Sequence, residues 1–207
     1  DQDRTLYVAG RRSVSVRVSG QWSEGRTPPG VNAFSGVSAG FSPKGDKPVF
    51  YALSGPSLFV SRDGGANWTL ATLPGTGASL QAVATSLHHP ETAYLSYSRL
   101  QVEGGPFFGV ARTDDFGQSW HLVWKESRQS AGNIHDIWIT ERFGPGWGEN
   151  PLNLGVAPDD PNLCYGTDYG RTMRTADGGQ NWHAVYSAKV HDGGFTTNGL
   201  DVTTCYG

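Results

Sequence analysis

One octapeptide pattern occurs three times in this chain of 207 residues. It reads SRDGGANW at residues 61–68, TDDFGQSW at residues 113–120 and TADGGQNW at residues 175–182, so each copy fits [ST]xDxGxxW. A fixed cluster that recurs at intervals of about 50 to 60 residues is typical of one supersecondary unit used repeatedly. The chain is therefore predicted to be an array of similar units.

Each octapeptide also contains the residues of a tight hairpin turn. The aspartate is expected to accept hydrogen bonds from backbone amides, and the glycine to supply a positive φ angle. The tryptophan is expected to begin the returning strand and to pack on the sheet. These structural residues are Ser61, Asp63, Gly65 and Trp68 in the first copy, Thr113, Asp115, Gly117 and Trp120 in the second, and Thr175, Asp177, Gly179 and Trp182 in the third.

These octapeptides resemble the Asp-box (BNR) repeat of sialidases, xyloglucanases, sortilin-type receptor ectodomains and a photosystem assembly factor. The resemblance implies an all-β fold, a β-propeller of four-stranded antiparallel blades. Function stays open, because the repeat occurs in enzymes and in non-enzymes. The composition agrees with short strands joined by turns, since the chain has 29 glycines and only 17% charged residues.

Alignment on the octapeptides divides the single propeller region, 1–207, into units. Each octapeptide joins the third and fourth strands of a blade, and 1–31 is predicted to hold two strands of an earlier blade. The predicted units are a part-blade at 1–31, blades at 32–74, 75–126 and 152–187, an inserted loop at 127–151, and a linker with the start of the next blade at 188–207. Three blades and two part-blades indicate either a piece of a longer propeller, which we favour, or a closed propeller of four blades.

Strand order predicts two faces. In an antiparallel blade, the octapeptide turns share one face with the turns between strands one and two. The longer connections at 98–106, 127–151, 168–170 and 188–199 are expected on the opposite face, together with His135 and His191. Loops on a rigid scaffold commonly carry function, so this opposite face is the predicted functional face.

Aromatic and charged side chains are frequent in these connections. Trp138, Phe143 and Trp147, with Arg142, are candidates for a sugar-binding surface, because aromatic rings beside polar groups suit sugar rings. The alternative is that a buried strand contains Ile134, Ile137, Trp138 and Ile139, which leaves only Phe143 and Trp147 as candidates. Asp136 and Asp192 are weak candidates for a catalytic carboxylate, and the alternative for each carboxylate, including Glu103, is a solvated charge.

The stretch CYGTDYGRTMRTADGGQNW resembles the xyloglucanase family of glycoside hydrolases, in which a TDxG turn carries a catalytic aspartate. Thr167, Asp168 and Gly170 match that turn. The resemblance implies that Asp168 is a catalytic carboxylate, the general base that activates water, with Tyr169 beside it as a candidate for substrate binding. The family's other aspartate has no matching segment in this chain, so the second carboxylate stays unassigned.

Other functions find less support. A net charge of -3 without basic runs disfavours nucleic acid, and no apolar stretch predicts membrane insertion. No metal-ligand spacing or cofactor motif occurs, so no metal and no cofactor are expected. Cys164 and Cys205 are expected either to pair or to lie as free thiols in strands. We expect an extracellular or periplasmic protein whose signal peptide has been removed.

Two functions stay open. The first is a carbohydrate-active propeller, a glycoside hydrolase that binds a polysaccharide or oligosaccharide. The second is a non-catalytic propeller that binds a protein or peptide in the manner of sortilin-type ectodomains or assembly factors. In either case the remainder of the propeller, or a second chain, is expected to complete the fold.

Overall fold

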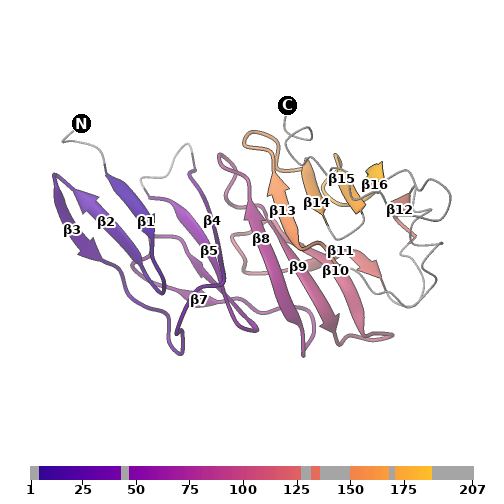
Figure 1. The fold of residues 1–207 in the computed structure, drawn as a ribbon, viewed down its shortest axis with the longest axis horizontal. Helices are drawn as coiled ribbons and strands as arrows, with labels where there is room; N and C mark the ends of the chain where they lie inside the picture. Colours follow the sequence, from indigo (N-terminus) through magenta and orange to yellow (C-terminus); the bar gives the residue numbers. More distant parts are fainter. Residues whose placement is uncertain (1–4, 43–46, 127–131, 136–149, 168–170, 188–207) are drawn as a thin grey trace.

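The computed structural model describes residues 5–42, 47–126, 132–135, 150–167 and 171–187. Every regular element among these residues is a β-strand, and the strands form successive sheets along the chain (Figure 1). We call the sheet of the first three strands the N-terminal sheet and the next three sheets blades 1 to 3. The octapeptides at residues 61–68, 113–120 and 175–182 are boxes 1 to 3.

Each blade is an antiparallel meander whose box joins its third strand to its fourth. Blade 1 contains β4 (Gly36–Gly40), β5 (Val49–Ser54), β6 (Ser57–Ser61) and β7 (Thr69–Leu70). Blade 2 contains β8 (Ser79–Thr85), β9 (Ala93–Leu100), β10 (Phe107–Thr113) and β11 (His121–Glu126). Blade 3 contains β13 (Asn153–Val156), β14 (Cys164–Thr167), β15 (Arg171–Thr175) and β16 (Trp182–Ser187), with β12 (Ile134–His135) beside β16. The predicted all-β fold of four-stranded blades is confirmed.

The N-terminal sheet has three strands where the sequence predicted two. They are β1 (Leu6–Ala9), β2 (Val14–Val18) and β3 (Gln21–Glu24). Ser19 and Gly20 join β2 to β3 with φ angles of 47° and 81°. Two positive φ angles in a two-residue hairpin loop are those of a type I′ turn. Residues 19–22, SGQW, have the serine and tryptophan of a box but no aspartate, and their serine and glycine form this two-residue turn without one.

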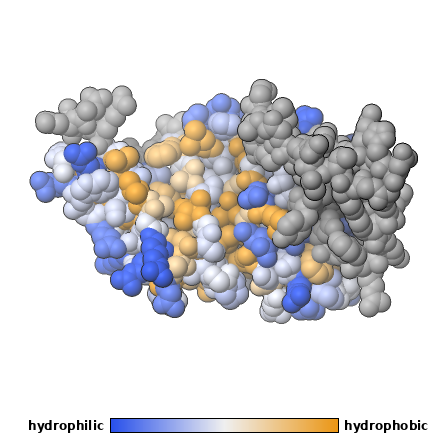
Figure 2. Space-filling view, in the orientation of Figure 1, coloured by the Kyte–Doolittle hydropathy of each residue, from blue (hydrophilic) through white to orange (hydrophobic). Residues whose placement is uncertain are grey.

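The core lies between neighbouring blades. Side chains of β5, β6, β8, β9 and β10 form one cluster between blades 1 and 2, including Tyr51 and Tyr97, which are fully buried. A second cluster between blades 2 and 3 contains Trp124, Met173 and Trp182. Alternation along each strand sends apolar residues to these boundaries. Further apolar residues lie among polar ones on the face drawn in Figure 2.

Candidate functional site

The three boxes fold into the same hydrogen-bonded turn. In box 1, the Ser61 hydroxyl accepts a hydrogen bond from the Gly65 amide at 2.8 Å and donates one to Asp63 Oδ1 at 2.9 Å. The amide of Asn67 donates to the same Asp63 oxygen at 2.8 Å. Boxes 2 and 3 repeat these contacts with Thr113, Asp115, Gly117 and Ser119, and with Thr175, Asp177, Gly179 and Asn181. The aspartates therefore brace the turns.

The seventh box position also binds the aspartate, which the sequence analysis did not foresee. Asn67 Nδ2 donates to Asp63 Oδ2 at 2.7 Å, and Ser119 Oγ donates to Asp115 Oδ2 at 2.5 Å. Burial alone would raise the pKa of Asp115, but the bonds from Ser119, Thr113 and the Gln118 amide outweigh burial and lower this pKa to about 2. The pKa values of the other two box aspartates are lowered for the same reason.

The fifth box position is a glycine for a second reason besides its positive φ. A Cβ atom on Gly117, whose φ is 78°, would lie 2.8 Å from Val60 Cγ2 in blade 1. A Cβ on Gly65 or Gly179 would lie 2.6 Å from the Cβ of Val14 or Val123 in the sheet before it. Each box therefore packs its glycine against a valine of the preceding sheet, where no side chain fits.

Two tyrosines outside the boxes, which the sequence did not single out, also join neighbouring blades. Tyr51 in β5 donates its hydroxyl to the Pro90 carbonyl at 2.7 Å, in the turn between the first two strands of the next blade. Tyr94 in β9 donates to the Pro161 carbonyl at 2.9 Å in the corresponding turn. A tyrosine in the second strand of each blade, upstream of the box, is the sequence signal that could have shown this contact.

Arg112 forms a buried polar cluster at the boundary between blades 2 and 3. Its Nε donates to both oxygens of Asp114, at 2.9 and 3.0 Å, and its NH1 donates to the Tyr94 hydroxyl at 2.8 Å. NH1 also donates to Asn162 Oδ1 at 3.0 Å in blade 3. Burial opposes the charge of Arg112, but these bonds outweigh it and raise the pKa of the guanidinium. Arg112 is therefore charged, and its hydrogen bonds link blade 2 to blade 3.

All three boxes lie on one side of the sheets. The guanidinium of Arg62 in box 1 stacks on the ring of Phe116 in box 2 at 4.4 Å. Asp114 of box 2 and Asp177 of box 3 line one pocket. The turns between first and second strands lie on the same side, since the Phe116 amide donates to the Glu91 carbonyl at 3.0 Å.

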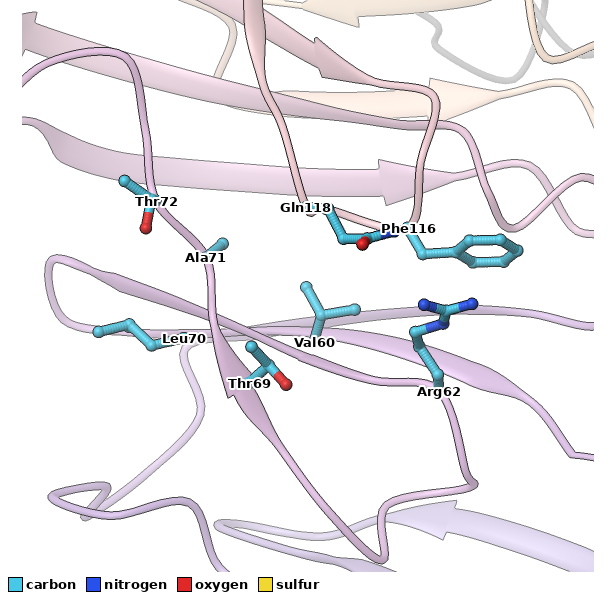
Figure 3. Close-up of a pocket in the computed structure, with 9 residues that line it drawn as sticks. Val60, Arg62, Thr69, Leu70, Ala71, Thr72, Phe116 and Gln118 are labelled. Atoms are coloured by element: carbon cyan, nitrogen blue, oxygen red, sulfur yellow. The ribbon is translucent and has the colours of Figure 1, made fainter.

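Each box lines a groove. The opposite wall of the groove is formed by the last strands of the preceding sheet. Groove 1 is lined by Val16, Val18 and Gly64, and groove 3 by Leu122, Val123 and Gly179, among other residues. Groove 2 is a cavity of about 400 Å³ (Figure 3). Its lining residues are Val60, Arg62, Thr69, Leu70, Ala71, Thr72, Phe116, Gly117 and Gln118. These concave surfaces lie on the box side, not on the predicted functional face.

The predicted site residues outside the boxes lie outside the described residues. They are Asp136, Trp138, Arg142, Phe143, Trp147, Asp168, Tyr169 and Asp192. The strand ends around Asp168 are described: β14 ends at Thr167 and β15 begins at Arg171, with Thr167 opposite Thr172. Box 3 joins the other end of β15 to β16. Thr167 and Arg171, the described residues on either side of this connection, therefore lie at the blade end opposite box 3.

Two connections in the described part of the predicted functional face pair with each other. The Gln101 amide donates to the Thr76 carbonyl at 2.8 Å, and the Thr76 amide donates to the Gln101 carbonyl at 3.2 Å. The candidate Glu103 is exposed in the second connection. A carboxylate that the sequence analysis missed, Glu126, is 1% exposed at the same end of β11 and accepts a hydrogen bond from Trp124 Nε1 at 3.2 Å. The alternation of WKE places both side chains on one face.

The prediction that His135 lies on the functional face is wrong. β12 pairs in parallel with the box end of β16, with Ile134 opposite Trp182. His135 Nε2 lies 3.0 Å from Asn181 Oδ1 in box 3, and its ring stacks on His183. Strand order alone could not show this, because part of the insertion returns to the box side before it pairs.

One of the two cysteines, Cys164, lies within the described residues. Cys164 is a fully buried free thiol in β14, and burial raises its pKa; Cys205 lies outside the described residues. No group of three or more metal-ligating side chains occurs in this part of the chain. None of its elements is a helix long and apolar enough to cross a membrane.

Comparisons with known proteins point to propeller enzymes. No family model matches the chain. A curated xyloglucanase of Hypocrea jecorina (strain QM6a) is 28% identical over 163 residues, which cover 79% of this chain and 18% of the relative. This chain therefore spans about a fifth of that relative's length.

Two solved structures share the fold. An ancestral GH74 enzyme aligns with a TM-score of 0.56 and 14% identity, over 90% of this chain and 23% of its own. The GH74 xyloglucanase of Xanthomonas campestris aligns with a TM-score of 0.55 and 17% identity, over 84% of this chain and 26% of its own. The fold is accordingly that of part of a β-propeller, as the sequence predicted.

Proposed function

We propose that the protein to which this chain belongs hydrolyses glycosidic bonds within a polysaccharide. The observation that carries the proposal is the similarity to a curated xyloglucanase over 79% of the chain. Xyloglucan is therefore the first substrate to test. A polysaccharide of this kind lies outside cells, so we propose an extracellular or periplasmic location.

Asp168 is the proposed general base. In this role its carboxylate would take a proton from water as the water attacks the anomeric carbon, and an acid on the other side of the bond would protonate the leaving oxygen. Inversion requires about 6.5 to 9.5 Å between the two carboxyl groups, and retention about 5 Å. Asp192 is the proposed partner to test first, because Asp136, the other candidate, directly follows His135, which lies on the box side. The TDxG turn after β14 and its position in the chain order, ahead of box 3, support the assignment.

Substrate binding is proposed for the aromatic residues of the insertion. Trp138, Phe143 and Trp147 would contact the apolar faces of sugar rings, and Arg142 and Tyr169 would donate hydrogen bonds to hydroxyl groups. Their composition supports this role, because rings and donors occur together in one segment.

The test is hydrolysis of xyloglucan and other polysaccharides by the full-length protein, followed by reducing ends. Replacing Asp168 by Asn should lower kcat by a factor of about 10² to 10⁴, since a positioned base contributes that much. The matched control is D159N, which changes an exposed carboxylate on the box side. Undiminished hydrolysis by D168N would remove the assignment, and no hydrolysis of any polysaccharide by the wild type would remove the function.

A second candidate is a propeller that binds a protein partner without catalysis. The exposed apolar residues of the N-terminal sheet favour it. Leu6, Val8 and Trp22 share one face of this sheet and are 48, 43 and 55% exposed. Apolar residues gathered on one sheet commonly mark a contact surface.

A further inference from the structure

We propose that groove 2 binds an extended, acidic peptide segment of another protein, added as a short parallel strand at the box end of β11. The groove lies between the residues that follow Trp68 and the turn of box 2 (Figure 3). This binding site goes beyond hydrolysis and does not depend on it.

Groove 3 shows how such a segment is held. β12 lies beside β16 as a parallel strand, and the Trp182 amide donates to the Asn133 carbonyl at 2.8 Å. Asn133 Nδ2 donates to the Val123 carbonyl at 2.7 Å and to the Gly179 carbonyl at 3.1 Å, so the side chain joins both walls of the groove. Ile134 is buried among the residues between blades 2 and 3. The chain therefore places its own short strand along one wall of groove 3, beside a remaining cavity of about 440 Å³.

Groove 2 is lined by residues at the corresponding positions of the preceding blade and box, but no strand of the described chain lies in it. Ala71 and Val123 each lie three residues after the tryptophan of a box, and Gly117 and Gly179 are both the fifth residue of a box. Both pairs line their grooves. The carbonyls of Ala71 and Gly117 therefore correspond to the two acceptors of the Asn133 side chain. In groove 2 the Trp120 Nε1 donates to the Gly117 carbonyl at 3.2 Å, whereas in groove 3 the Trp182 Nε1 donates to the Val123 carbonyl at 3.2 Å, so in each groove one of the two carbonyls also binds the box tryptophan.

The backbone donor for an added strand is also available. Trp120 corresponds to Trp182, whose amide is bonded to β12. Within the described ranges, no acceptor lies within hydrogen-bond distance of the Trp120 amide, and no donor reaches the Ala71 carbonyl. β11 is an edge strand of its sheet. Addition of an extended segment to such an edge is a common mode of peptide recognition.

Charge selects an acidic segment. Groove 2 has Arg62 and Phe116 where groove 3 has Asp114 and Gly178. The Arg62 guanidinium lies over the Phe116 ring, and Figure 3 shows the two side chains facing each other at one end of the groove. No carboxylate of the described chain forms an ion pair with Arg62. Its N–H groups are therefore available to a ligand carboxylate.

The direction of the added strand determines where the acidic residue lies in the peptide. It should come just before the asparagine that corresponds to Asn133. β12 runs parallel to β16, away from the boxes, so the residue ahead of Asn133 lies toward the box side, where Arg62 lies in groove 2. A Cβ atom on Gly132 would meet nothing within 4 Å in groove 3. A peptide with the order acidic residue, asparagine, isoleucine therefore fits groove 2.

Fluorescence anisotropy with the full chain tests the proposal. The probe is a labelled peptide, Ser-Ala-Asp-Asn-Ile-His, which follows residues 130–135 with Asp in the place of Gly132. We expect saturable binding that Arg62→Ala weakens by a factor of about three to ten, because one charge-assisted contact is lost. Arg26→Ala is the matched control, since it removes an exposed arginine outside the groove.

Two further changes distinguish this groove from other surfaces. Thr69→Trp should fill groove 2 and abolish binding, and a probe with Leu in place of Asn should not bind. NMR should show a shift of the Trp120 backbone amide on addition of the probe. Absence of saturable binding at millimolar probe, or equal affinity for wild type, Arg62→Ala and Thr69→Trp, would overturn the proposal. Self-association that Thr69→Trp abolishes, without probe binding, would assign the groove to a second copy of the chain.

Discussion

Trp182 meets Tyr94 edge to face across the boundary between blades 2 and 3, with ring centroids 6.5 Å apart and planes at 88°. Trp120 and Tyr51 repeat this contact between blades 1 and 2, at 6.4 Å and 87°. The tryptophan belongs to a box, and the tyrosine belongs to the second strand of the blade before it. Each of these boxes is therefore fixed to two sheets, and the boundary between blades is the repeated unit of packing.

Replacing Tyr94 by Phe should destabilise the chain by about 1 to 3 kcal/mol, because its hydroxyl donates to Pro161 and accepts from Arg112 inside the boundary. Tyr51→Phe removes a single bond, to Pro90, and should cost about 0.5 to 1.5 kcal/mol. Urea unfolding measures both. Tyr7→Phe is the control, since the Tyr7 hydroxyl has no partner in the described part of the chain; equal midpoints for all three variants would contradict the prediction.

Gly117→Ala should destabilise the chain more than Gly55→Ala. Both glycines have positive φ angles, 78° and 56°, so each alanine costs about 1 kcal/mol of backbone strain. Only at Gly117 does a Cβ also meet Val60, which should add about 1 to 3 kcal/mol of overpacking. Thermal unfolding of the two variants gives the difference. Val60→Ala should reduce the effect of Gly117→Ala in the double variant; additive effects would show that the close contact is unimportant.

Most of the fold could be predicted because the box pattern is local. Serine or threonine, aspartate and glycine form one turn from residues adjacent in sequence, so three copies define the third and fourth strands of three blades. The pairing of β12 with β16 could not be predicted in the same way. It joins Ile134 to Trp182 through a backbone ladder that no repeated motif marks.

The contacts between blades were equally invisible in the octapeptides. Tyr51 and Tyr94 lie at different distances ahead of their boxes, because the connections between strands differ in length. In the sequence, nothing distinguishes Arg112 from other strand residues. Its role depends on Asn162 of the next blade, which it contacts only in the folded chain. Sequence spacing defines a turn well, whereas a contact across a boundary depends on where two sheets meet.

Arg112→Ala should destabilise the chain by about 2 to 4 kcal/mol, since it removes a buried cation that binds Asp114, Tyr94 and Asn162. Arg174 occupies the corresponding place in blade 3, just before the first residue of box 3, and is exposed. Arg174→Ala should therefore change stability by less than about 0.5 kcal/mol. Guanidinium chloride unfolding measures both; similar losses from the two variants would show that the cluster does not tie the blades.

The box aspartates should make stability depend on pH only in acid. The pKa of Asp115 is about 2 in the folded chain, below the value of about 4 expected for an unfolded aspartate. A lowered folded pKa stabilises the fold above the unfolded pKa, and this contribution is lost as the pH falls from about 4 to about 2. Thermal midpoints of the wild type should therefore stay level from pH 7 to about 5 and then fall.

Asp115→Asn tests this prediction. At pH 7 its thermal midpoint should be lower than that of the wild type, because the variant loses the charge that Ser119 and Thr113 bind. The difference between the two midpoints should close near pH 2, as the wild-type carboxylate gains a proton. A gap that stays constant down to pH 2 would mean that the charge of Asp115 does not stabilise the turn.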